Sequence, residues 1–233
     1  MKLRMMLGGV LLMTSLGVIA AAEPTVEQVK SKEALMILSE FIGKWNGNGA
    51  AEGGKDLWKE GMTLGWKFNK DGDSWLVADF AKSKLYTGGE LKYDLKKKVY
   101  QFTVNTADKK TLAFEGEFKK GILEMYAVDD ASKDKTRLSI STNNEGARLI
   151  YNVALQPKSK GFFKKTYGVS HAREGVELAG GKKQECIVTG GLGTMPVSHG
   201  GKTYYVCCSG CRDAFNEDPA KFVREFEAKQ KKK

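Results

Sequence analysis

The chain has 233 residues, with 38 lysines and arginines, 28 aspartates and glutamates, and a formal net charge of +10. Its hydrophobic fraction of 41% excludes a largely disordered chain, and its 27 glycines and 4 prolines exclude a collagen-like or proline-rich protein. The length fits one large or two small domains. With 2 histidines and 4 cysteines, a metal or redox site has few residues to draw on.

The first 22 residues have the pattern of a signal peptide. Lys2 and Arg4 precede an apolar run at 5–19, and alanines at 20–22 fit a cleavage site before Glu23. A retained anchor is the alternative, but the run is short for a span, which needs about 20 apolar residues. We therefore expect an exported protein, periplasmic or secreted, with no membrane span after the signal is removed.

Lysine clusters account for the positive charge. They lie at 96–98, 119–120, 164–165 and in the tail that includes 230–233, so they are spread along the chain. No basic motif interleaved with aromatic residues for base stacking is present. We expect a solvated basic surface and no nucleic-acid partner, with weak, salt-sensitive attraction to anionic envelope polymers as the remaining possibility.

A helix is predicted over residues 26–41, because apolar residues recur there at helical spacing with charged residues between them. Thr25 is the predicted N-cap, with Gln28 at the position where a capping box more often has an acid. Gly43 ends the pattern.

Short strands separated by turn signals are predicted from residue 44 to about residue 173. Tyr100, Phe102 and Val104 alternate with polar residues, which predicts one buried and one wet face in an antiparallel meander. About eight strands in this length indicate a closed barrel, which also removes exposed edges. The predicted runs lie at 58–68, 75–80, 91–95, 99–105, 112–118, 122–128, 137–142 and 149–156.

This stretch resembles the lipocalin-like barrels of the calycin group. The resemblance rests on the sequence from Leu38 to Trp45, in which a helix runs into Gly-x-Trp at the first strand, on the meander behind it, and on Arg173. It implies a barrel domain at 23–175, with Trp45 at its floor and a small apolar ligand inside. A barrel filled by side chains is the alternative. A haem-binding barrel would need an axial ligand, and we expect a surface or packing role for His171 at the barrel's end.

All four cysteines lie in a C-terminal unit predicted at 184–229, after a glycine-containing linker at 176–183. Cys186 is followed after twenty residues by Cys207 and Cys208, and Cys211 comes two residues after Cys208. A strand is predicted to end in the cysteine pair, followed by a helical turn and a terminal helix. Asp218 is the predicted N-cap of that helix, with Pro219 in its first position.

The unit resembles the TRASH and YHS group of small metal-binding modules, which implies heavy-metal sensing, trafficking or resistance. The segment at 189–194 is longer than the group's usual turn, and Cys208 is an additional thiol. The residues that carry the resemblance are Cys186, the strand at 201–205, Cys207, Cys211, Phe215, Asp218 and Pro219.

A unit this small needs a staple, and three or four thiolates suit Zn(II), Cu(I) or another soft metal ion. Cys186, Cys207 and Cys211 are the first-choice ligands and Cys208 the fourth, with His199 and Met195 as weaker candidates. Two disulfides are the alternative in an exported protein, and a redox role of the thiols is a further one.

The sequence has no nucleophile elbow, phosphate loop or histidine-rich catalytic site, so we expect a binding protein rather than an enzyme. The leading hypothesis is an exported protein that buffers, senses or delivers a soft metal ion. The alternatives are a carrier of a small apolar ligand whose C-terminal unit is only structural, and a thiol oxidoreductase using Cys208 and Cys211. No protein partner is indicated.

Overall fold

The computed structural model describes residues 24–54, 56–143, 146–175 and 184–230. The predicted signal peptide at 1–22 and the predicted linker at 176–183 lie outside these ranges, as do the last three residues of the basic tail. Among the described residues, no helix combines the length and apolar character needed to cross a bilayer.

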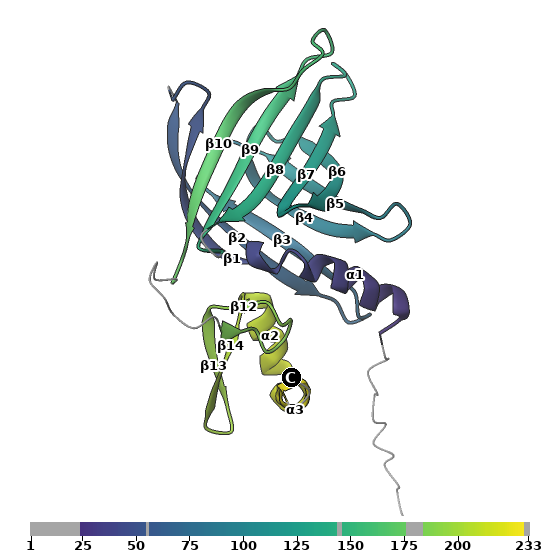
Figure 1. The fold of residues 1–233 in the computed structure, drawn as a ribbon, viewed down its shortest axis with the longest axis vertical. Coiled ribbons are helices and arrows are strands. Elements are labelled where there is room, and N and C mark those ends of the chain that lie inside the picture. The colour runs from purple at the N-terminus through teal and green to yellow at the C-terminus, as the bar shows by residue number, and fades with distance from the viewer. Residues whose placement is uncertain (1–23, 55, 144–145, 176–183, 231–233) are drawn as a thin grey trace, which may run out of the picture.

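Ten antiparallel strands form a closed barrel (Figure 1). Each strand pairs with its neighbours in sequence, and the barrel closes where β1 pairs with β10, from Trp45 opposite Arg173 to Ala51 opposite Tyr167. The strands are β1 Gly43–Ala51, β2 Leu57–Phe68, β3 Ser74–Ala81, β4 Tyr86–Asp94, β5 Val99–Thr106, β6 Thr111–Lys119, β7 Ile122–Val128, β8 Lys135–Asn143, β9 Arg148–Gln156 and β10 Lys164–Arg173.

The predicted closed barrel is confirmed, with ten strands rather than about eight. The expected alternation is also confirmed, since Tyr100, Phe102 and Val104 on β5 are buried while Thr103 and Asn105 are exposed. Two strands have no counterpart among the predicted runs. The sequence indicated β1 only through the resemblance at Trp45, and it did not indicate β10, because the residues that β10 turns inward include His171 and Arg173 as well as Val169.

Helix α1 (Val26–Met36) crosses one end of the barrel (Figure 1). Its N-terminus is the predicted capping box of Thr25 and Gln28. The helix is shorter than the predicted span to residue 41, because the chain tightens into a 3-10 turn, η1 (Ser39–Phe41), in which the Phe41 N–H donates to the Leu38 carbonyl. This turn directs Phe41 into the core and leads into Trp45, which is buried and donates from Nε1 to the Phe41 carbonyl at 2.8 Å.

The described C-terminal residues form two short hairpins and two helices at the same end of the barrel as α1 (Figure 1). Asp218 accepts the Lys221 N–H at the start of the last helix, as an N-cap does. The elements are β11 Gln184–Glu185, β12 Leu192–Gly193, β13 Met195–His199, β14 Lys202–Val206, α2 Ser209–Glu217 and α3 Pro219–Gln230.

Candidate metal centre

Three chain segments bring three of the cysteines together. Cys186 follows β11 and forms a parallel bridge with Tyr205, whose carbonyl accepts the Ile187 N–H at 2.8 Å. Cys207 directly follows β14, and Cys211 lies in the first turn of α2. Because the bridge places Cys186 beside the end of β14, residues far apart in the sequence share one site.

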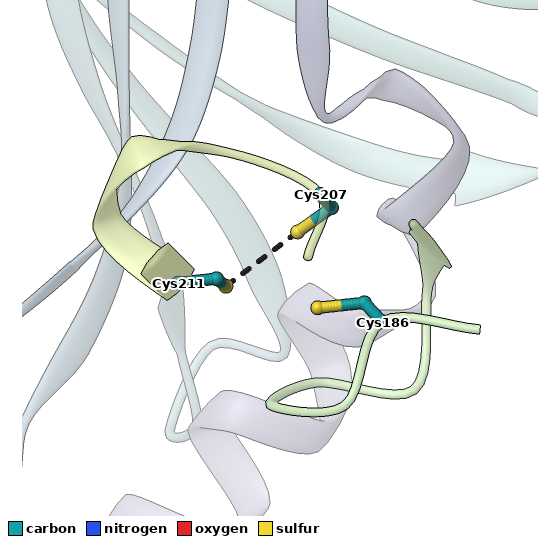
Figure 2. Close-up of side chains that lie close together, drawn as sticks. All are labelled: Cys186, Cys207 and Cys211. Carbon is teal, nitrogen blue, oxygen red and sulfur yellow. Dashed lines mark hydrogen bonds between the residues drawn. The ribbon is translucent and has the colours of Figure 1, made fainter. Parts of the chain in front are cut away.

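The sulfurs of Cys186, Cys207 and Cys211 all lie within 4.8 Å of one another, and those of Cys207 and Cys211 are 3.5 Å apart (Figure 2). All three residues are buried. Thiolates that share one ion at about 2.3 Å stand about 3.8–4.0 Å apart, so this spacing fits a single soft metal ion. The cysteine cluster could therefore hold a metal ion.

Cys208 lies beside these three sulfurs rather than among them. Its sulfur is 3.9 Å from that of Cys207 and accepts the backbone N–H of Trp66, on barrel strand β2, at 3.2 Å. Cys208 is the N-cap of α2, where the chain leaves its extended conformation, so its side chain is free to point away from Cys207. The fourth predicted ligand thus contacts the barrel as well as the cysteine cluster.

The weaker candidates lie elsewhere on the β13–β14 hairpin. His199 pairs with Lys202 at its turn end, whereas Cys207 follows its other end, so about 13 Å of strand separates His199 from the sulfurs. Met195 pairs with Val206, one residue before Cys207.

Two cations from outside the C-terminal unit act on the sulfurs. The Arg173 guanidinium is buried, lies 4.1 Å from the centre of the Trp45 ring, and donates to the carbonyls of Gly146 and Ile42. Burial lowers the pKa of Arg173 to about 10, and the charges of Glu40 and then Cys207 act in the opposite direction. Burial also lowers the pKa of Lys32 on α1, against the effect of Cys211. The end of the barrel therefore offers positive charge to a thiolate cluster.

The thiols also influence one another. Hydrogen bonds from Cys207 and then Cys211 lower the pKa of Cys186, and hydrogen bonding to Cys186 raises the pKa of both partners. Hydrogen bonding within the cluster therefore favours a thiolate stabilised by neighbouring thiols, and metal binding would release the remaining protons.

The cysteines do not form disulfides in the structure. All four are free thiols, and the 3.5 Å between the sulfurs of Cys207 and Cys211 is well beyond the S–S bond length of about 2.05 Å.

A second buried polar cluster lies inside the barrel. Glu60 accepts hydrogen bonds from Trp58 Nε1 at 2.6 Å and from the Tyr151 hydroxyl at 2.8 Å, and its Oε1 lies 3.1 Å from His171 Nε2. His171 is 1% exposed and its ring lies close against Gly47, so the packing role expected for it holds and the surface alternative does not. His171 Nδ1 has no partner among the described residues.

The barrel interior is mostly filled by side chains. A cavity of about 30 Å³ lies among apolar residues that include Met62, Leu91, Phe102 and Leu138. This is room for one or two water molecules, far below the roughly 150 Å³ of a cavity that holds benzene.

Sequence reasoning missed the barrel's part in the cysteine site. Arg173 was noted only for its place in the barrel pattern, and Lys32 and the Trp66 N–H carried no signal. The two cations act electrostatically on Cys207 and Cys211, and the Trp66 N–H contacts Cys208, and these effects arise only in the folded chain.

No family model matches the chain, and no curated protein matches it. Among solved structures, the chain is similar to Rv2717c from M. tuberculosis, with 13% identity over 60% of this chain and 97% of that one and a TM-score of 0.40. A likeness at this level does not indicate what either part of the chain binds.

Proposed function

We propose that this is an exported metal-binding protein whose C-terminal cysteines hold a soft metal ion, Zn(II), Cu(I) or a heavy metal, in order to buffer, sense or deliver it. The observation that carries the proposal is the convergence of three buried sulfurs within 4.8 Å. Sulfur ligands select soft ions, and burial protects the bound ion from water. Cys208, beside Cys207, is the proposed fourth ligand.

The surroundings of the sulfurs support this role. Three thiolates around a divalent ion carry net negative charge, which is costly to bury unless it is compensated. Arg173 and Lys32 supply that compensation. The unit has few large buried side chains of its own, so a bound ion would contribute directly to its folding free energy.

The two alternative functions, a ligand carrier and a thiol oxidoreductase, have less support. A carrier of a small apolar ligand needs a far larger cavity than the one in the barrel. A thiol oxidoreductase needs an accessible nucleophilic thiol, and the most exposed of the four cysteines is Cys208 at 4%. We therefore propose a binding role without catalysis.

The test is metal content together with a free-thiol count on protein isolated without chelator. About one equivalent of zinc or copper is expected, with thiols that react only after chelation. Cys207→Ser should abolish retention of the ion, whereas Val206→Ala, at the buried position before it, should not. Absence of both metal and free thiols would establish disulfides and end the proposal.

Export is tested separately by the N-terminal sequence of the protein recovered outside the cytoplasm. The proposal predicts that it begins at Glu23. An intact N-terminus in the cytoplasm would leave the metal site in place but remove the proposed location.

A further inference from the structure

The segment of residues 157–165, which comprises the loop between β9 and β10 and the first two residues of β10, combines positive charge with an exposed aromatic side chain. It contains Lys158, Lys160, Lys164 and Lys165 and no acidic residue. Between the lysines lie two adjacent phenylalanines, of which Phe162 is 64% exposed. A single exposed aromatic side chain is common on protein surfaces, so what distinguishes this segment is its combination with the lysines and with the apolar residues beside it.

The four lysines are not neutralised by the chain itself. Among the described residues, none of their ammonium groups takes part in an ion pair. The nearby acids of the β7–β8 loop have other partners. Asp130 pairs with Lys133 at 3.7 Å, and Asp134 accepts the backbone N–H of Lys158 rather than its side chain. The positive charge of the loop is thus available to an outside partner.

The loop has a defined conformation that turns Phe162 outward. The Lys160 N–H donates to the Pro157 carbonyl at 2.8 Å, which closes a turn before the phenylalanines. Phe163 packs on the outside of the barrel, 5.7 Å from the Tyr126 ring and 5.0 Å from the Arg137 guanidinium. With Phe163 held in this way, its neighbour is left in solvent.

The loop lies at the end of the barrel away from α1 and the C-terminal helices (Figure 1). Val128 and Tyr126, on the outer face of β7, are 52% and 39% exposed and continue the apolar surface beside Phe163. The patch is therefore an apolar centre bordered by lysines at one tip of the molecule.

We propose that the 157–165 loop docks the protein on an anionic lipid bilayer. Phe162 would enter the interface between headgroups and acyl chains, and the lysines would pair with lipid phosphates. A single-stranded nucleic acid fits less well, because it needs successive aromatic faces in a groove, and Phe163 is already covered by Tyr126 and Arg137. In this orientation the cysteine cluster faces away from the membrane.

The experiment is sedimentation of the whole mature protein with vesicles of phosphatidylcholine alone or mixed with phosphatidylglycerol. Binding is expected only with phosphatidylglycerol and should weaken as salt is added. Each neutralised lysine should lower partitioning about fivefold, so Lys158→Gln with Lys160→Gln should lower it about 25-fold. Phe162→Ser should lower it about tenfold.

The matched control is Lys70→Gln with Lys96→Gln, which removes the same charge from exposed turns at the opposite end of the barrel. If this control weakened binding as much as the loop variant did, attraction would depend on net charge alone and the proposal would be wrong. It would also be overturned if the wild-type protein ignored phosphatidylglycerol, or if the loop variants lost binding to a single-stranded oligonucleotide but kept binding to vesicles. Circular dichroism of each variant verifies that the barrel is intact.

Discussion

Replacing Glu60 by glutamine tests whether the buried polar cluster requires a full carboxylate. Both oxygens of Glu60 accept, one from Trp58 and the other from Tyr151, with His171 beside it. A glutamine amide has one accepting oxygen and one donating nitrogen. Because the indole N–H of Trp58 can only donate, the amide oxygen must face Trp58 and the amide nitrogen must face the other two groups.

The Tyr151 hydroxyl can rotate and accept from that nitrogen. His171 Nε2 can accept only if the ring proton moves to Nδ1, where it finds no partner. At least one buried donor is then unsatisfied, which costs about 1–3 kcal/mol of the free energy of unfolding. Glu60→Leu deprives all three groups of their acceptor and should cost about 3–5 kcal/mol.

Urea unfolding followed by far-UV circular dichroism measures these differences as a shift in midpoint at constant slope. The control is Glu117→Gln on the outer face of β6, whose side chain is 51% exposed and should change stability by no more than about 0.5 kcal/mol. If Glu60→Gln lowered the free energy of unfolding no more than this control does, the conclusion that the variant leaves a buried donor unsatisfied would be wrong.

The same variant has a pH signature. Burial raises the pKa of Glu60, but hydrogen bonding by His171, Trp58, Ser83 and Tyr151 outweighs it and holds the pKa below the ordinary value of 4.5. A lowered folded-state pKa contributes stability that is present above the unfolded pKa and is lost as pH falls through the folded one. The difference in unfolding free energy between wild type and Glu60→Gln should therefore shrink below about pH 4.5.

Three further predictions concern the C-terminal residues and the end of the barrel beside them. A Cβ at Gly210 would lie 1.8 Å from the Trp66 carbonyl oxygen, so Gly210→Ala should cost about 1–3 kcal/mol and speed hydrogen exchange in α2, with unchanged exchange in the barrel as the control. Arg173→Met deprives the Gly146 and Ile42 carbonyls of a charged donor and should cost at least about 2 kcal/mol in thermal unfolding. Chelation of the metal-loaded protein should raise exchange in residues 184–230 and leave β5 protected; equal loosening of both would contradict a local metal site.

The sequence was sufficient for most of the barrel because most strands alternate apolar and polar residues. It failed for β10, where His171 and Arg173 take inward positions that the pattern assigns to apolar side chains. The burial of His171 depends on Glu60, and that of Arg173 on the carbonyl of Ile42 just before β1. No local sequence pattern reveals either partner.

The cysteine spacing was equally informative about which thiols come together. It ranked Cys208 as the fourth ligand behind the other three, but it could not show where the Cys208 side chain points, because the direction of an N-cap side chain is decided by what packs against it. Here that is the N–H of Trp66, 142 residues earlier in the chain.

The seam between β1 and β10 also constrains the order in which the chain folds. Every other barrel pairing joins consecutive strands and can form as the chain lengthens, whereas this one joins residues 45–51 to residues 167–173. Closing so long a loop is slow, and until it closes β1 presents an unpaired edge to other chains. Arg173 on β10 stacks on Trp45 of β1 at the end of that seam, and this contact stabilises the closed barrel. Nascent or truncated chains that stop before residue 164 would lack both β10 and Arg173. We therefore expect them to aggregate through the exposed edge of β1.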